Sequence, residues 1–232
     1  MEIGVKSEHG SHHFSEKAAA MVTDVFASEV DRGVLLMRHS ARTFDPSIHD
    51  LLNKLTQHGR KLCSRLGEEL PKDLTLKGYA SPPSRCMETA EAIIQAHVDR
   101  GGAGARTRPV EALGVFYALD QQRMWKGLSS APSLQHYVSQ WFAGTVPGDV
   151  LIPAPLAVDL LLRVLQGKLQ APGAARQLDL CVTHDLTIYT VRHGVGLEAA
   201  PGAEVEFLDG LLLYERDSRL FMRDQRGNEV NL

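Results

Sequence analysis

The sequence predicts an α/β fold: a three-layer α/β/α sandwich with a mostly parallel central sheet and a small lid insertion. Short apolar runs alternate with longer runs whose apolar positions recur at helical spacing, as in a sheet covered by helices on both faces. Three of the apolar runs also end in polar clusters, which is typical of the strand ends where open α/β sheets bind ligands. The alternation breaks off over residues 116–150, which marks an insertion.

The individual elements follow from this alternation. We expect strands near 33–38, 74–80, 106–110 and 178–183 with a C-terminal pair at 204–215 and 219–223, and helices near 56–70, 83–98, 154–169 and 186–194. Residues 14–30 predict a further helix packed outside the sheet, after a weakly ordered polar tail at 1–12. Pro82 and Pro83 suit the start of a helix, because a missing N–H costs nothing in the first turn.

Size and composition indicate a soluble protein of one domain. The 232 residues include 44% hydrophobic and 23% charged residues, and we expect a tail and helix at 1–32 before a single domain at 33–232. The net charge of −3 gives no general attraction for nucleic acid or an anionic membrane, and neither is expected as a partner. No apolar run has the length of a signal peptide or a membrane span, so we expect a cytoplasmic protein.

The cysteines favour a reducing compartment. Cys63, Cys86 and Cys181 are odd in number and widely spaced, without a Cys-x-x-Cys pair. This pattern argues against a disulfide framework and against a thiolate zinc site.

The first polar cluster places a histidine between two arginines at the end of an apolar run. Residues 34–42 read Val-Leu-Leu-Met-Arg-His-Ser-Ala-Arg, so that Arg38 and Arg42 flank His39. Guanidinium forks match phosphoryl oxygens two at a time, and a neutral imidazole is a nitrogen nucleophile near pH 7. The cluster therefore predicts a phosphate site.

Two later clusters repeat this arrangement. The run at 74–80 leads into Ser-Pro-Pro-Ser-Arg, which ends at Arg85, and the run at 178–183 leads directly into His184 and Asp185. Because the carboxyl ends of parallel strands meet at one edge of a sheet, we expect all three clusters to face one pocket.

Together, these motifs closely resemble the histidine phosphatase superfamily, also called the phosphoglycerate-mutase-like fold. The resemblance rests on the Arg-His-Ser-Ala-Arg run at 38–42, the segment from Ser81 to Ala90 and the Thr-His-Asp run at 183–185. The segment from Leu55 to Gly59 adds the Leu-Thr-x-x-Gly pattern that opens the next helix in that family. The pair of His184 and Asp185 resembles the acid phosphatase branch, although this chain is shorter and poorer in cysteine than its secreted members.

The resemblance implies the role of each residue. His39 is the expected nucleophile, and the three arginines should lower its pKa by disfavouring a further positive charge. The phosphoryl-binding residues are expected to be Arg38, Arg42, Arg85 and His184. The arginines take the electrophilic role of a metal, so we expect no metal site and no cofactor.

Two residues compete for the role of general acid. In the branch that carries His-Asp, the aspartate after the second histidine protonates the leaving group, and Asp185 matches it. In the other branch, a glutamate after the following strand does so, and Glu111 is the nearest candidate. Asp185 is the favoured acid, although it also suits a helix N-cap.

The resemblance implies that the insertion at 116–150 is a lid, because in relatives an insertion in this part of the chain folds over the phosphate pocket. It holds six aromatic residues, for which we weigh two interpretations. They are Phe116, Tyr117, Trp125, Tyr137, Trp141 and Phe142. They either pack a short helix onto the body, or contact an apolar leaving group. The run at 191–194, Val-Arg-His-Gly, imitates the first motif, but it follows no strand and is interpreted as the end of a helix.

The sequence therefore predicts a phosphatase that hydrolyses a small phosphomonoester through a phosphohistidine on His39, with Asp185 as the acid. A phosphoprotein phosphatase acting on phosphohistidine or phosphotyrosine is a variant. A mutase, or a phosphate-binding protein without turnover, are the rivals. The substrate and the oligomeric state cannot be predicted from the sequence.

Overall fold

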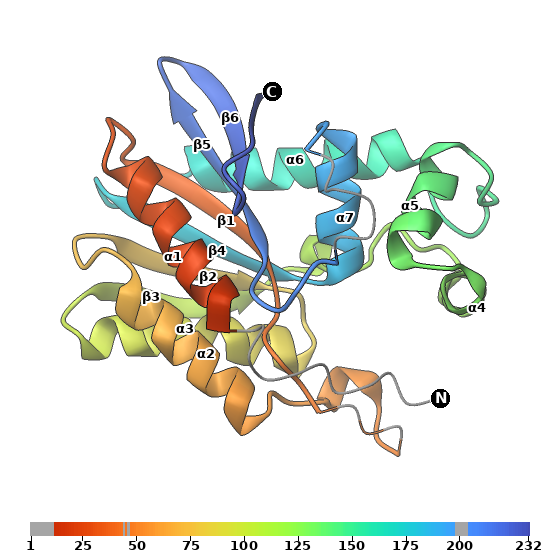
Figure 1. The fold of residues 1–232 in the computed structure, drawn as a ribbon, viewed down its shortest axis with the longest axis horizontal. Coiled ribbons are helices and arrows are strands. Elements are labelled where there is room, and N and C mark those ends of the chain that lie inside the picture. Colours follow the sequence, from red (N-terminus) through yellow and green to blue (C-terminus); the bar gives the residue numbers. More distant parts are fainter. Residues whose placement is uncertain (1–11, 44, 46, 198–203) are drawn as a thin grey trace.

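The computed structural model describes residues 12–43, 45, 47–197 and 204–232, so the expected tail lies almost wholly outside the described residues. The centre is a seven-stranded sheet with the order β3-β2-β4-β1-β5-β6-β7 (Figure 1). The strands are β1 (Arg32–Arg38), β2 (Thr75–Ala80), β3 (Ala103–Pro109), β4 (Gln177–Thr183), β5 (Gly210–Arg216), β6 (Arg219–Asp224) and β7 (Glu229–Asn231). The predicted α/β fold class is confirmed.

The sheet is mixed. β3, β2, β4 and β1 pair in parallel, whereas β5, β6 and β7 continue the sheet in antiparallel fashion. The expected strand start at residue 204 is wrong, since β5 begins only at Gly210. The chain before it turns at Leu208, whose φ is 63°, and the Val205 N–H is bound by the Tyr189 hydroxyl. The sequence pattern also does not predict the short strand β7.

Helices cover both faces of the sheet. They are α1 (His12–Phe26), α2 (Gln57–Glu69), α3 (Ser84–Asp99), α4 (Gln121–Ser130), α5 (Leu134–Phe142), α6 (Ala154–Gln170) and α7 (Asp185–Gly194). The predicted helices agree with these to within two residues, except that α1 ends at Phe26 and not at residue 30. None of the helices in the described part of the chain is long and apolar enough to cross a membrane.

Each face of the sheet has its own hydrophobic core. Alternate residues of β1 divide between them, because successive side chains of a strand point to opposite faces. Leu35 and Met37 pack with α1, α2 and α3, and Val34 and Leu36 pack with α5, α6 and α7 (Figure 1). The central strands are therefore buried on both sides, and their ends can carry polar groups.

Gly59 allows α2 to approach the chain that follows β1. Thr56 caps the helix by accepting the Gly59 N–H at its Oγ1 (2.9 Å). A Cβ on Gly59 would lie 2.1 Å from the carbonyl oxygen of Ala41, so no larger residue fits. The Gly59 carbonyl also accepts from Ser40 Oγ (2.9 Å). The Leu-Thr-x-x-Gly pattern thus packs a helix start against the first motif.

The segment at 116–150 contains α4 and α5; α5 lies beside α7 at the end of the sandwich, and α4 packs against α5 (Figure 1). Tyr117, Tyr137 and Trp141 are buried in the core on that side, and Trp141 Nε1 donates to the Ile152 carbonyl (2.8 Å). Trp125 is exposed. Most of these aromatics thus pack a helical segment onto the body, and the action of the segment as a lid stays a prediction.

Candidate active site

Three neighbouring strands bring the three predicted clusters to one edge of the sheet. β2, β4 and β1 are adjacent, parallel and in register at their carboxyl ends. The residues that follow these ends are Ser81, His184 and His39. The ring centroids of His39 and His184 lie 5.7 Å apart, and Ser81 Oγ is 2.9 Å from His184 Nε2. The sheet topology therefore assembles one site from segments far apart in the sequence.

Backbone carbonyls fix the ring of His39. The backbone N–H of His39 donates to the carbonyl of Thr183 (3.0 Å), which fixes the main chain. The ring Nδ1 of His39 lies 2.8 Å from the Ser40 carbonyl oxygen. Because a carbonyl only accepts, Nδ1 carries the proton and Nε2 keeps its lone pair. Burial and the charge of Arg38 lower the pKa of His39 well below its usual value. The ring is therefore a neutral imidazole with a nucleophilic Nε2.

His184 is neutral for similar reasons. It is buried, and burial together with the charge of Arg85 lowers its pKa to about 4. Its Nε2 lies 3.9 Å from Cys86 Sγ as well as near Ser81. Burial raises the pKa of the Cys86 thiol to about 12, and all three cysteines are buried free thiols.

Arg38 is held by its two terminal nitrogens. Nη2 pairs with Asp185 Oδ2 (3.0 Å), and Nη1 donates to the Val205 carbonyl (2.6 Å). The ring of Phe207 covers the guanidinium, with its centroid 4.5 Å from Cζ. Asp185 begins α7, and its Oδ1 accepts from the Leu186 N–H (2.8 Å). The structure thus places the favoured acid in the cluster, where it is a hydrogen-bond acceptor.

Arg42 and Arg85 are joined by a carboxylate that the sequence analysis does not predict. Asp50 lies in the short helix η1 (Asp50–Leu52), and its Oδ1 pairs with Arg42 Nη1 (3.1 Å). Its Oδ2 pairs with Arg85 Nη2 (2.9 Å), and its main-chain carbonyl accepts from Arg85 Nη1 (2.9 Å). All four predicted phosphate-binding residues therefore lie around the carboxyl ends of β1, β2 and β4.

Arg38 and Arg85 have the same pattern of used and unused donors. In each, the terminal edge formed by Nη1 and Nη2 faces protein oxygens, as described above. The Nε of each is buried and has no hydrogen-bond partner among the described residues. An unpaired buried donor costs roughly 1–3 kcal/mol, and the Nε and Nη2 edge of each arginine therefore has a donor that an acceptor could still satisfy.

Glu111, the alternative acid, lies at the same edge of the sheet but is exposed. It begins the short helix η2 (Glu111–Leu113), which follows β3. The Leu113 carbonyl accepts from Thr183 Oγ1 (2.6 Å), which fixes η2 over the end of β4. Asp185 joins the cluster through its ion pair with Arg38, whereas the Glu111 side chain forms no ion pair or hydrogen bond with any described residue of the cluster.

Sequence reasoning does not find three contacts of the site. Asp50 begins η1, a short helix that no sequence pattern predicts, and Val205 and Phe207 stand in the segment expected to be a strand. β5 runs antiparallel to β1, so the residues before Gly210 arrive at the carboxyl edge and turn over Arg38. An aromatic residue just before a strand that returns to this edge is a weak signal that points to such a contact.

The imitation motif at 191–194 lies at the end of α7, as predicted. Arg192 is buried and pairs with the equally buried Asp209, with 3.2 Å between Nη2 and Oδ1. The His193 ring packs against Phe142 at a centroid distance of 4.3 Å, with the ring planes tilted by 55°. These residues therefore fasten α7 to its neighbours.

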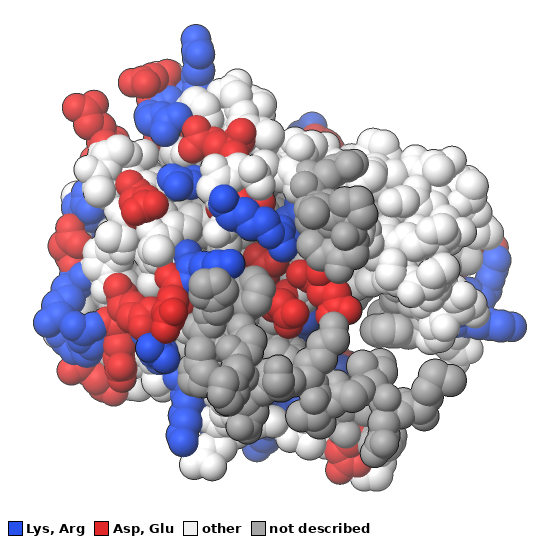
Figure 2. Space-filling model, in the orientation of Figure 1, with Lys and Arg blue, Asp and Glu red and all other residues white. Residues whose placement is uncertain are grey.

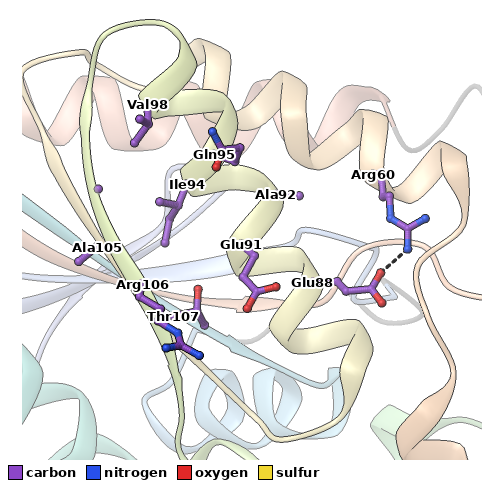
Figure 3. A pocket seen from close by; sticks show the side chains of 11 residues that line it. Arg60, Glu88, Glu91, Ala92, Ile94, Gln95, Val98, Ala105, Arg106 and Thr107 are labelled. Atoms are coloured by element: carbon purple, nitrogen blue, oxygen red, sulfur yellow. Dashed lines mark hydrogen bonds and ion pairs between the residues drawn. The ribbon is translucent and has the colours of Figure 1, made fainter.

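A separate surface groove lies between α3 and the edge strand β3 (Figure 3). Arg60 pairs with Glu88 at one end of it (2.6 Å), and Glu91 and Arg106 lie farther along. No residue that lines this groove belongs to the cluster around His39. On the face drawn in Figure 2, basic side chains lie among acidic ones, and the lobe of α4 and α5 is largely uncharged.

Acid is expected to destabilise the fold through the neutral histidines. Folding lowers the pKa of His184 to about 4, and it also lowers the pKa of His39. In the unfolded chain both histidines have a pKa of about 6.5, so below that pH the unfolded chain binds more protons than the folded protein. Stability present above pH 6.5 is therefore lost as the pH falls toward 4. The slope is about 1.4 kcal/mol per pH unit for each histidine at most.

Urea unfolding at several pH values between 7.5 and 4.5 measures this slope. Other groups titrate in the same range, so the comparison is with His184→Gln, whose amide keeps a polar group near Ser81 without a titratable ring. We expect a shallower decline in the variant. Equal slopes in the two proteins would show that His184 is not the source.

Comparisons with known proteins support the fold. No sequence-family model matches the chain, and no curated protein sequence matches it. Among solved structures, a phosphoglycerate mutase from Bacillus anthracis is similar at 14% identity and a TM-score of 0.50, over 86% of this chain and 91% of that one. A putative phosphohistidine phosphatase SixA from Agrobacterium tumefaciens matches at 14% identity and a TM-score of 0.45, over 85% and 96%.

Sequence identities of 14% show the fold, and the chemistry has to be argued from the residues of the site. The similarity to the mutase extends over most of both chains. The chain thus has the α/β fold that is seen in the phosphoglycerate mutase from Bacillus anthracis.

Proposed function

We propose that the protein is a phosphatase that hydrolyses a small phosphomonoester through a phosphohistidine on His39. The observation that carries the proposal is the neutral imidazole of His39, with Nε2 unprotonated, in a cluster of three arginines. A nitrogen nucleophile and fixed cationic donors are what transfer of a phosphoryl group requires.

In the proposed first step, His39 Nε2 attacks phosphorus as the bond to the leaving oxygen breaks. Arg38, Arg42, Arg85 and His184 hold the phosphoryl oxygens, whose charge is spread in the transition state. Asp185 gives its proton to the departing oxygen, as in the acid phosphatase branch. In the second step, water attacks phosphorus, Asp185 takes a proton from it, and the phosphate leaves His39 unprotonated at Nε2.

Trapping of the intermediate tests the proposal. The protein is mixed with a ³²P-labelled phosphomonoester, quenched after milliseconds to seconds and separated from free label. We expect protein-bound phosphate that is labile in acid and stable in alkali, and that maps to the peptide containing His39. Label on another residue, or turnover without trapped label at any quench time, would overturn the phosphohistidine mechanism.

Release of inorganic phosphate from a panel of phosphorylated metabolites, phosphopeptides and a nitrophenyl phosphate identifies the substrate class. A protein that binds phosphate but releases none from any of them would be a binding protein without turnover. Each assay is repeated in EDTA, and we expect no loss, because arginines replace a metal in this proposal. Among the described residues, no three side chains of His, Cys, Asp or Glu form a metal-ligand group.

Conversion of Arg85 to lysine is expected to reduce kcat/KM by about 10² to 10³-fold. Lysine keeps the charge but lacks the planar fork, so it loses both the contacts to Asp50 and the Nε donor. Steady-state kinetics with the best panel substrate measure the loss. Arg163→Lys is the control, because Arg163 pairs with Asp159 on the exposed surface of α6, away from the cluster around His39. Near-equal kinetics for Arg85→Lys and the control would remove Arg85 from the phosphate site.

A further inference from the structure

Asp50 contacts two arginines of the proposed phosphate site. Its two carboxylate oxygens are divided between two guanidinium groups, Oδ1 to Arg42 and Oδ2 to Arg85, at 3.1 and 2.9 Å. Its main-chain carbonyl adds a second bond to Arg85. The Arg85 side chain is 7% exposed, whereas the Asp50 side chain is 46% exposed. An accessible carboxylate therefore fixes a buried cation.

The contacts use one particular edge of Arg85. The bonds from Nη1 and Nη2 to Asp50 occupy the terminal edge of the guanidinium. The Nε donor, on the side edge, has no hydrogen-bond partner in the part of the chain that the structure describes. Arg38 repeats this pattern, with Val205 and Asp185 at its terminal edge and an unpartnered Nε. Both arginines are thus held from one side and keep the bidentate side edge.

The negative charge of Asp50 also offsets the repulsion between Arg42 and Arg85. Burial and the nearby Arg85 lower the pKa of Arg42, and the carboxylate of Asp50 opposes this effect. Two guanidinium groups that share one small site repel each other when no anion is bound. A carboxylate between them offsets the repulsion and keeps both groups in the site.

We propose that Asp50 is a positioning residue of the phosphate site, which bridges Arg42 and Arg85 by their terminal nitrogens and turns the side edge of Arg85 toward the phosphoryl oxygens. The inference rests on the proposed function. In this arrangement Asp50 stays in place when phosphate binds, and the phosphate adds bonds at donors that Asp50 does not use. The opposite arrangement, in which Asp50 occupies the phosphoryl position and must leave, predicts tighter phosphate binding once Asp50 is removed.

The sign of the effect on phosphate binding decides between these arrangements. Isothermal titration of orthophosphate into the parent protein, Asp50→Ala, Asp50→Asn and Asp50→Glu measures it. We expect on the order of 10-fold weaker binding for the alanine and asparagine variants, because misplaced arginines lose charge-assisted bonds. We expect partial recovery for the glutamate variant, which restores the negative charge on a longer side chain.

Asp45→Asn is the matched control for charge. Asp45 lies in the same segment and bonds to Ser47, and an asparagine side-chain oxygen can keep accepting those bonds. We expect it to bind orthophosphate as the parent does. An urea unfolding curve for each variant separates loss of the fold from loss of binding.

Steady-state kinetics and a triple variant test the role of Asp50 independently of the titrations. We expect Asp50→Ala to raise KM for a phosphomonoester by about the factor by which it weakens phosphate binding. Asp50→Ala should cost little further binding in an Arg42→Ala, Arg85→Ala background, because its partners are then absent.

The outcomes separate the two proposals. If the parent protein neither binds orthophosphate nor releases it from any substrate, the proposed function fails. If the parent binds orthophosphate, and Asp50→Ala binds it equally or more tightly, the positioning role of Asp50 is overturned while the proposed function stands. The same holds if Asp50→Glu, although folded, recovers none of the loss.

Discussion

Replacement of His39 by alanine is expected to reduce turnover by about 10⁴-fold or more, because the variant has no nucleophile to carry the phosphoryl group. The arginines would still bind the substrate, so we expect KM and orthophosphate affinity to change far less than kcat. Single-turnover kinetics with ³²P-labelled substrate measure both the rate and the protein-bound label, which should be absent.

A matched variant separates loss of the nucleophile from local distortion. His39→Ala also removes the Nδ1–H that donates to the Ser40 carbonyl, which costs about 1 kcal/mol. His39→Asn places an amide N–H near that carbonyl but supplies no nucleophile. We expect both variants to fold and both to be inactive. Substantial activity in either folded variant would exclude His39 as the nucleophile.

The strands that carry the site were predictable because they are buried. β4 is buried along its whole length, and a mostly apolar run, interrupted by Asp179, that ends at His184 predicts both the strand and the site at its end. The parallel pairing of β1, β4 and β2 then follows from the helices between them. These two facts explain why residues from three distant motifs could be assigned to one site.

The rest of the site depends on loops, whose paths local patterns do not encode. Asp50 reaches Arg85 across 35 positions of sequence, and nothing in its neighbourhood distinguishes it from Asp45. Phe207 lies in a stretch of alternating acidic and apolar residues that is typical of a strand, but the positive φ of Leu208 turns the chain over Arg38. The two contacts are tertiary, and only the assembled fold brings them to the arginines.

Replacement of Asp185 by asparagine is expected to slow formation of the phosphoenzyme in a way that depends on the leaving group. For an alkoxide, which leaves poorly without a proton, the loss should be on the order of 10² to 10⁴-fold. For a nitrophenolate, which needs little protonation, it should be much smaller. Rapid-quench rates of label transfer from an alkyl and a nitrophenyl phosphate, compared in the parent and the variant, measure the two losses.

The ion pair between Asp185 and Arg38 makes this comparison necessary. Asparagine keeps an oxygen that can accept from Arg38 Nη2, but the charge is gone, so some loss of binding is expected with either substrate. Only a missing proton donor produces a defect that grows as the leaving group becomes poorer. Glu111→Gln is the matched test of the alternative acid. A leaving-group-dependent defect in Glu111→Gln, with a uniform defect in Asp185→Asn, would assign the proton to Glu111 and leave Asp185 to orient Arg38.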